Sequence, residues 1–218
     1  MSTGSPTFDP AIPSHPPVIG QPAWDVALLY PPQGQWSEEQ YLSLTDQTRR
    51  LVEYTDGKIE VLSMPTIEHQ RILKFLLWAL DSFVTRNNLG EVLLAGTRVY
   101  IDPKKYREPD VVFCSNARVA RSGTRYYDGA DLVMEVVSDD PASQQRDLEQ
   151  KPSDYAEGGV PEYWIVDPQQ QKITVLSLQG SAYVEHGVFV PGETATSKLL
   201  PGFTVSVTET FAAAKPNA

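Results

Sequence analysis

Two acidic residues lie in or beside apolar, strand-like segments, and this combination can support metal chemistry. Asp110 precedes the apolar run 111–114, and Glu135 lies inside the apolar run 132–137. If these runs pair as neighbouring strands, the two carboxylates meet at one end of a sheet. Like charges repel and burial removes their water, and a divalent cation relieves both costs. Oxygen ligands suit Mg²⁺ or Mn²⁺. Alternatively, Glu135 faces water on an edge strand or pairs with an arginine.

A polar segment downstream supplies a lysine at the spacing of a helix face. Asp147, Lys151 and Tyr155 follow at four-residue intervals within 141–157, so they line one side of a predicted helix. An ammonium group beside a metal would stabilise charge on a phosphoryl group or assist an attacking water. The alternative is an exposed Asp147–Lys151 ion pair of small energetic value. Pro152 follows Lys151 directly and is expected to kink this helix.

Sequence periodicity predicts the elements that must position these residues. A capping box at Ser37 and Gln40 predicts a short helix over about 37–46, and Asp56-Gly57 predicts a hairpin. From Thr66, apolar residues recur every three or four positions until Asn87, which predicts one long amphipathic helix. Strand-like runs are expected at 91–101, 109–114, 131–138, 163–166, 172–178 and 183–190. This order predicts an α/β or α+β fold with a central sheet.

Composition favours a single folded domain. The chain has 218 residues, of which 41% are hydrophobic and 21% charged, which suits one compact core. Residues 1–35 hold eight of the 18 prolines and are expected to form a flexible arm. We expect the domain over 36–210 and a short tail over 211–218.

The net charge and the small numbers of cysteine and histidine residues exclude several classes of function. A net charge of −10 excludes a broad cationic surface for indiscriminate binding to DNA or membranes. The single cysteine excludes an intramolecular disulfide, and with three histidines it leaves no zinc cage of standard spacing. The chain shows no secretory pattern and no apolar run that could span a bilayer, so a cytoplasmic location is expected.

One stretch is locally basic. Residues 98–125 contain seven basic and three acidic side chains and bracket Asp110. We expect phosphates of a nucleic acid to contact four of its cations: Arg98, Lys104, Lys105 and Arg107. A solvated connection with scattered charge is the alternative interpretation.

The order of these residues resembles a known family. The chain carries Glu53 with Asp56-Gly57, His69 at the start of the long helix, Pro109-Asp110, Glu135-Val136-Val137-Ser138, Arg146-Asp147, Lys151, Tyr155 and the string Gly159-Val160-Pro161-Glu162-Tyr163-Trp164-Ile165-Val166-Asp167. This pattern, over about 37–205, resembles the Uma2 family, also called DUF820. That family is similar to the restriction-endonuclease-like proteins of the PD-(D/E)xK superfamily. The resemblance implies a mixed central sheet flanked by helices, with additional antiparallel strands, and cleavage of nucleic acid with Mg²⁺.

The resemblance also implies roles for individual residues. Asp110 and Glu135 would bind the metal, together with the backbone carbonyl of Val136. The usual lysine of the superfamily would fall at position 137, which is valine, so Lys151 would take the role of a migrated lysine. The auxiliary residues implied are Glu53 at the metal, His69 at a phosphate or in a packing role, and Asp147 and Tyr155 beside Lys151.

Together these observations predict a Mg²⁺- or Mn²⁺-dependent endonuclease acting on DNA, with RNA as a second substrate to test. A homodimer through the apolar region 183–207 is a further hypothesis. The first alternative is a catalytically silent module that binds nucleic acid or a protein on the same fold. The second is a hydrolase of small phosphoesters that uses the same carboxylates.

Overall fold

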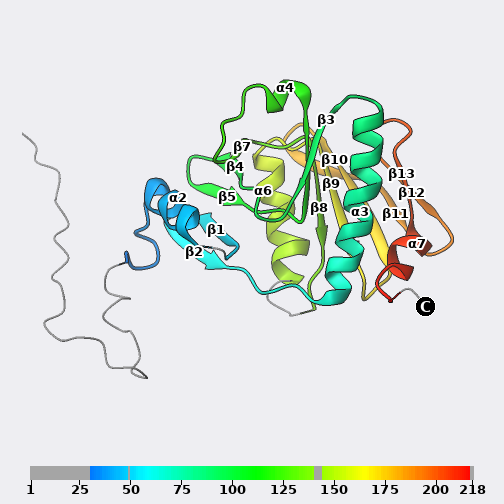
Figure 1. The fold of residues 1–218 in the computed structure, drawn as a ribbon, viewed down its shortest axis with the longest axis horizontal. Coiled ribbons are helices and arrows are strands. Elements are labelled where there is room, and N and C mark those ends of the chain that lie inside the picture. Colours follow the sequence, from blue (N-terminus) through cyan, green and yellow to red (C-terminus); the bar gives the residue numbers. More distant parts are fainter. Residues whose placement is uncertain (1–29, 49, 140–143, 217–218) are drawn as a thin grey trace, which may run out of the picture.

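The structure is a computed structural model that describes residues 30–48, 50–139 and 144–216 (Figure 1). The large sheet has the strand order β11 (Ala182–Phe189), β10 (Lys172–Gln179), β9 (Glu162–Asp167), β8 (Leu132–Val136), β6 (Val111–Ser115) and β3 (Gly90–Leu94). The small sheet has the order β2 (Lys58–Val61), β1 (Val52–Thr55), β5 (Lys105–Arg107), β4 (Val99–Asp102) and β7 (Tyr127–Asp128). A third pair joins β12 (Thr194–Thr196) to β13 (Thr204–Ser206). The helices are α2 (Glu38–Gln47), α3 (Ile67–Arg86), α4 (Asn116–Val119), the π-helical turn η1 (Arg146–Gln150), α6 (Lys151–Glu157) and α7 (Val207–Ala212).

The large sheet is mixed and buried on both faces. Strand β8 runs parallel to β9 and antiparallel to β6. Alternate β8 residues, Met134 and Val136, pack in the core that contains α3, whereas Val133 shares the opposite core with Tyr155 of α6. Because side chains alternate along a strand, Glu135 lies on the α6 side of the sheet. The predicted class, a mixed sheet flanked by helices with additional antiparallel strands, is confirmed.

The long helix α3 forms where the apolar period predicts it. Thr66 caps its N-terminus, because the Thr66 side chain accepts a hydrogen bond from the backbone of His69. Ile72, Leu76 and Leu80 recur at four-residue steps and are fully buried against the large sheet.

The predicted hairpin joins β1 to β2. Asp56 and Gly57 have φ values of 47° and 75°, as a two-residue turn of the primed type requires. A Cβ atom at position 57 would lie 2.6 Å from the carbonyl oxygen of Gly34, so only glycine fits there. Tyr41 of α2 packs against Tyr54 of β1 and fixes the hairpin to the helix before it.

Two predicted elements differ in the structure. The run 91–101 is not one strand, because the chain turns around Gly96, whose φ is 95°; β3 therefore joins the large sheet and β4 the small one. The predicted helix 141–157 appears as η1 followed by α6. Residues 140–143 lie outside the described residues.

The structure describes residues on both sides of the two expected domain limits, residues 36 and 210. Residues 1–29 of the expected arm lie outside the described residues. At the other end, α7 continues past the expected limit at 210 to Ala212. In the described part of the chain, no helix is both long and apolar enough to cross a membrane.

Candidate active site

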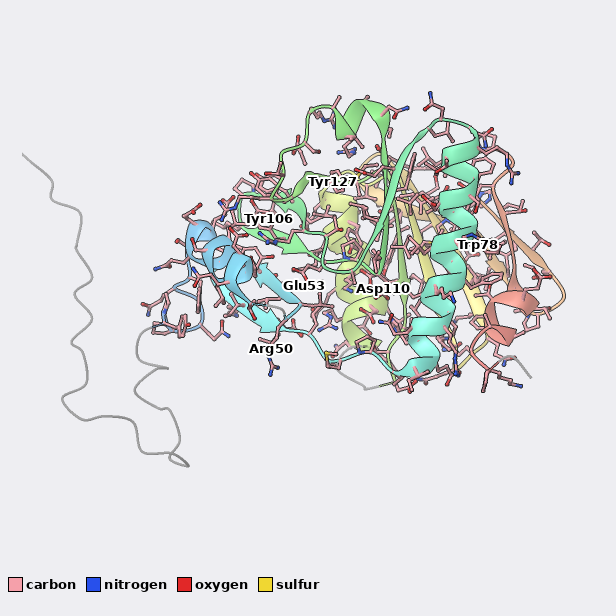
Figure 2. The ribbon with its side chains drawn as sticks, viewed as in Figure 1. Arg50, Glu53, Trp78, Tyr106, Asp110 and Tyr127 are labelled. Carbon is pink, nitrogen blue, oxygen red and sulfur yellow. The ribbon has the colours of Figure 1, made fainter. Side chains whose placement is uncertain are left out.

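Asp110 and Glu135 meet at one end of the large sheet. Val111 of β6 pairs with Met134 of β8, which brings Asp110 beside the end of β8. Oδ2 of Asp110 accepts a hydrogen bond from the backbone N–H of Val136 at 2.8 Å. In Figure 2, Asp110 lies at this end of the sheet, with Glu53 on the neighbouring hairpin. The expected pairing of the two strands is therefore observed.

Glu135 is held by two donors inside the protein. Its Oε1 accepts a hydrogen bond from the Tyr155 hydroxyl at 2.7 Å and lies 2.9 Å from the Lys151 ammonium nitrogen. Burial raises the pKa of Glu135, the Lys151 charge opposes this effect, and the nearby Asp110 charge adds to it; the pKa is raised overall. Glu135 is neither exposed nor paired with an arginine, so the two alternatives for this residue do not describe it.

Lys151 lies at the centre of a cluster of carboxylates. Its Nζ lies 3.1 Å from Asp147 and 4.0 Å from Oε1 of Glu53. Burial lowers the pKa of Lys151, but the carboxylates of Glu135 and Asp147 outweigh burial and raise it. The ammonium is therefore charged at neutral pH, and the Asp147–Lys151 pair is buried rather than exposed.

The helix that presents Lys151 accommodates Pro152 through a π-helical turn. Proline lacks a backbone N–H, and its ring crowds the carbonyl four residues earlier. The turn η1 lies directly before α6, and Pro152 falls in the first turn of α6, where proline is tolerated. The expected kink therefore takes the form of a π turn, and Lys151 still reaches Glu135.

Asp147 and Glu53 approach Lys151 from separate elements. The Tyr163 hydroxyl donates a hydrogen bond to the backbone carbonyl of Asp147 at 3.0 Å and fixes that turn to β9. Oε1 of Glu53 accepts a hydrogen bond from the backbone N–H of Glu108 at 3.2 Å. The cluster is thus assembled from β1, β8 and the η1–α6 helix.

His69 contacts the other side of Asp110. Its Nε2 lies 3.1 Å from Oδ1 of Asp110. Burial lowers the pKa of His69, but the hydrogen bond and charge of Asp110 outweigh burial and raise it. His69 therefore contacts a predicted metal ligand, and it lies in the first turn of α3.

These residues line one cavity of about 380 Å³. Asp110, Glu135, Val136, Asp147 and Lys151 all contribute to its wall, as does His69. Glu53 instead lines a second cavity, which shares Arg146 with the first. The structure thus brings together the residues predicted to act in catalysis, with Glu53 in the wall of the neighbouring cavity.

The donors in this cavity fit a magnesium ion. In the described part of the chain, no group of three or more His, Cys, Asp or Glu side chains is arranged to hold a metal. Mg²⁺ is usually held through one or two carboxylates and keeps several waters, so Asp110, Glu135 and the Val136 carbonyl suffice. Oε2 of Glu108, which lines the same cavity, is buried and has no hydrogen-bond partner among the described residues. The described lining carries six carboxyl side chains against two of fixed positive charge, Arg146 and Lys151, so it has excess negative charge that a cation would neutralise.

Glu108 should make the stability of the protein depend on pH. Burial, followed by the charge of Glu53, raises the pKa of Glu108 to about 7. Between pH 4.5 and 7 the Glu108 carboxyl has lost its proton in the unfolded chain but still holds it in the folded protein. The free energy of unfolding therefore falls as pH rises. A Glu108→Gln protein lacks this loss and should exceed wild type in stability at pH 8 by roughly 2 to 3 kcal/mol, with little difference at pH 4.

Urea unfolding at pH 4, 6 and 8 in EDTA measures this difference. Glu185→Gln makes the same change of charge on the exposed strand β11 and should follow wild type. If Glu108→Gln and wild type lose the same stability between pH 4 and 8, the pKa of Glu108 is not raised.

Removing the Tyr155 hydroxyl should affect stability more than chemistry. Tyr155→Phe deletes one donor to buried Glu135, and we expect a loss of about 1 to 3 kcal/mol in the free energy of unfolding. Lys151 still holds Glu135, so any cleavage rate should fall by less than about tenfold, which is about 1.4 kcal/mol. Denaturant melts and cleavage assays measure both quantities. Tyr183→Phe, which deletes a hydrogen bond to the Val160 carbonyl, is the control. A loss of cleavage above 100-fold would contradict a positioning role.

The four cations expected to contact nucleic acid lie outside the wall of the main cavity. Arg107 is buried and pairs with Asp154 at 2.5 Å, and Lys105 pairs with the same carboxylate at 2.6 Å. Arg98 pairs with Asp46 at 2.9 Å. Lys104 is exposed at the β4–β5 turn. Three of these side chains therefore make ion pairs within the fold.

Four charged residues of the cavity wall were not among the predicted site residues: Glu68, Glu108, Asp139 and Arg146. Glu108 lies two positions before Asp110, and Arg146 lies directly before Asp147. Proximity to predicted ligands was a signal for these two, and Arg146-Asp147 was also part of the family pattern. The spacing of a regular helix does not place Arg146 on the face of Lys151, whereas the structure brings both residues to one wall.

Comparisons with known proteins identify the family of the chain and its fold. The model of the Uma2 family, described as "Putative restriction endonuclease", matches residues 38–208. A search of curated proteins gave no match. Among solved structures, the chain is similar to a putative nuclease belonging to DUF820 from Anabaena variabilis ATCC 29413, with a TM-score of 0.70 and 20% identity. The match covers 85% of this chain and 100% of that chain, and at this identity it shows the fold.

Proposed function

Because the chain belongs to the Uma2 family of putative restriction endonucleases, we propose that it hydrolyses phosphodiester bonds in DNA with Mg²⁺ or Mn²⁺. Asp110, Glu135 and the Val136 carbonyl would hold the ion at the end of the large sheet. When bound, the ion would supply Lewis acidity at a phosphoryl oxygen and lower the pKa of a bound water.

The side chains around Asp110 and Glu135 would have separate roles in hydrolysis. Lys151 would orient the attacking water or stabilise the charge that develops on the phosphate. Tyr155 and Asp147 would position Glu135 and Lys151 through the contacts described above. Water adds to phosphorus, the bond to the leaving oxygen breaks, and that oxygen takes up a proton.

One observation carries this proposal. A fully buried ammonium, that of Lys151, lies 2.9 Å from Glu135 in the wall of a cavity that Asp110 shares. Burying a lysine among carboxylates is costly, and perturbed charges of this kind are concentrated at functional sites. A lysine beside two acidic residues is also the arrangement that the resemblance implies for a nuclease.

Cleavage assays test the proposal directly. Supercoiled plasmid, linear duplex, single-stranded DNA and RNA are incubated with the full chain in Mg²⁺, Mn²⁺ or EDTA. We expect cutting of DNA in either metal and none in EDTA. Parallel calorimetry with Mn²⁺ should show binding to wild type that is lost when Glu135 is replaced by Gln.

The acidic character of the cavity favours one alternative, a module that binds without cutting. The lining includes Glu68, Glu108 and Asp139 in addition to the cluster around Lys151. Wild type that neither cuts any of these substrates nor binds Mn²⁺ would support that alternative. Hydrolysis of a small phosphodiester such as bis(4-nitrophenyl) phosphate, without cutting of nucleic acid, would instead support a phosphoester hydrolase.

A further inference from the structure

The cavity wall is strongly acidic for a site that must receive a phosphate. Its described lining contains six carboxylates, on Glu68, Glu108, Asp110, Glu135, Asp139 and Asp147. Only two residues of this lining, Lys151 and Arg146, carry a fixed positive charge. The fixed positive charge that an incoming phosphate can meet in this lining is therefore limited to these two side chains and any metal ion.

The two cations differ in their freedom to meet a substrate. Lys151 is 3% exposed and is held between Glu135 and Asp147, so it cannot turn toward the cavity mouth without leaving both. Arg146 is more accessible. It pairs with Glu60, an exposed residue on the edge strand β2, and its Nε lies 3.8 Å from the buried carboxylate of Asp147. Arg146 thus has, in Glu60, a counter-charge that faces solvent.

Arg146 also lies where two cavities meet. It lines the main cavity and a second cavity of about 700 Å³, to which Lys58 and Arg107 also contribute. A nucleic acid extends in both directions from the bond that is cut. A guanidinium shared by both cavities can hold a phosphate next to the reacting one.

We propose that Arg146 binds a phosphate of the substrate and that this phosphate displaces Glu60 from the guanidinium. The inference rests on the proposed function and names the residue that first receives the substrate. Exposed ion pairs contribute little because water competes with them, so Glu60 can be displaced. A phosphate accepts two parallel hydrogen bonds from arginine, which favours the exchange.

If a phosphate replaces Glu60 on Arg146, substitutions of Arg146 and of Glu60 should have opposite effects on the affinity for DNA. Dissociation constants are measured by fluorescence anisotropy with labelled single-stranded and duplex DNA, in Ca²⁺ to limit hydrolysis. Arg146→Gln should weaken binding by about tenfold or more, and Arg146→Lys by less, because lysine keeps the charge but not the fork geometry. Glu60→Gln should strengthen binding, by a few-fold, because it removes the competing carboxylate.

Salt dependence separates a phosphate contact from a structural role. Losing one phosphate contact should reduce the slope of log Kd against log salt by about 0.9 for duplex and about 0.7 for single strands. A merely structural arginine would leave this slope unchanged. Arg118→Gln is the matched control, because Arg118 is similarly buried and pairs with Asp131 at 2.9 Å outside both cavities.

The outcomes distinguish this inference from the proposed function. If Arg146→Gln binds with the affinity and salt slope of wild type, the inference is wrong even where wild type cuts DNA. If Glu60→Gln binds no more tightly than wild type, the exchange is wrong. If wild type binds DNA but does not cut it in Mg²⁺ or Mn²⁺, the proposed function fails while Kd still tests Arg146. If wild type binds no nucleic acid, both fail.

Discussion

Asp110→Asn is expected to reduce metal-dependent cleavage by about 10³-fold or more, because a neutral amide holds a divalent cation poorly and Lewis-acid stabilisation is worth several kcal/mol. The fold should be preserved. Asparagine has the shape of aspartate, and its oxygen can still accept the hydrogen bond from the backbone N–H of Val136. Single-turnover cleavage rates in Mg²⁺ and thermal melts in EDTA measure the two effects separately.

A second aspartate provides a matched control. Asp131 is as buried as Asp110, accepts a backbone hydrogen bond from Ser115 at 2.7 Å, and pairs with a basic side chain, Arg118. Asp131→Asn therefore loses a comparable set of contacts, but outside the cavity lining. We expect this variant to cut at the rate of wild type. Cleavage by Asp110→Asn at that same rate would remove Asp110 from the proposed metal site.

Elements governed by local rules were predictable from the sequence. The helix α3 follows from the apolar period between Ile67 and Arg86, and the β1–β2 hairpin follows from Asp56-Gly57. The division of 91–101 between two sheets was not predictable. Its strand-like residues continue on both sides of Gly96. The partner of β3 is β6, farther along the chain, whereas β4 pairs with β5, the strand that follows it.

The same distinction applies to the site. The pairing of Asp110 with the end of β8 was predictable, because two apolar runs that follow each other in the chain usually pair. The four-residue spacing of Asp147 and Lys151 predicted that their side chains lie together, and they do, although the turn between them is π-helical. The pairing of Arg107 with Asp154 could not be foreseen, because these residues are 47 positions apart and meet only after the small sheet has packed on α6.

The charge composition of a segment did not predict which of its cations can meet a ligand. Residues 98–125 have a net positive charge, which suggested a surface for phosphates. Arg98 and Lys105 instead pair with acidic residues of α2 and α6. A count of charges along the chain does not include these partners, so it overestimates the charge that a ligand would meet.

Lys151→Met is expected to lower the free energy of unfolding by about 3 to 5 kcal/mol, because it leaves Glu135 buried without the ammonium that pairs with it and removes from Asp147 the nearer of its two cations. Methionine keeps the length and the apolar stem of lysine, so the effect reports mainly the lost charge. Cleavage should also be lost, since the ammonium is proposed to act on the phosphate or the attacking water. Denaturant melts measure the first effect, and cleavage at a temperature where the variant is folded measures the second.

Lys105→Met is a matched control for stability. Lys105 also pairs with carboxylates, those of Asp154 at 2.6 Å, Glu157 at 2.8 Å and Asp102 at 3.8 Å, but Glu157 is exposed to solvent. Water can replace the lost ammonium there, so the expected loss is only about 1 kcal/mol. Equal losses in the two methionine variants would contradict the argument that burial makes Lys151 indispensable.

A compensated variant separates the two roles of Lys151. In Lys151→Met combined with Glu135→Gln and Asp147→Asn, the buried charges are removed together, and replacing a buried ion cluster by neutral groups is often tolerated. Stability should then recover most of the loss seen in Lys151→Met, while cleavage stays absent because a metal ligand and the ammonium are both gone. Failure to recover would mean that the loss in Lys151→Met does not come from the uncompensated carboxylates.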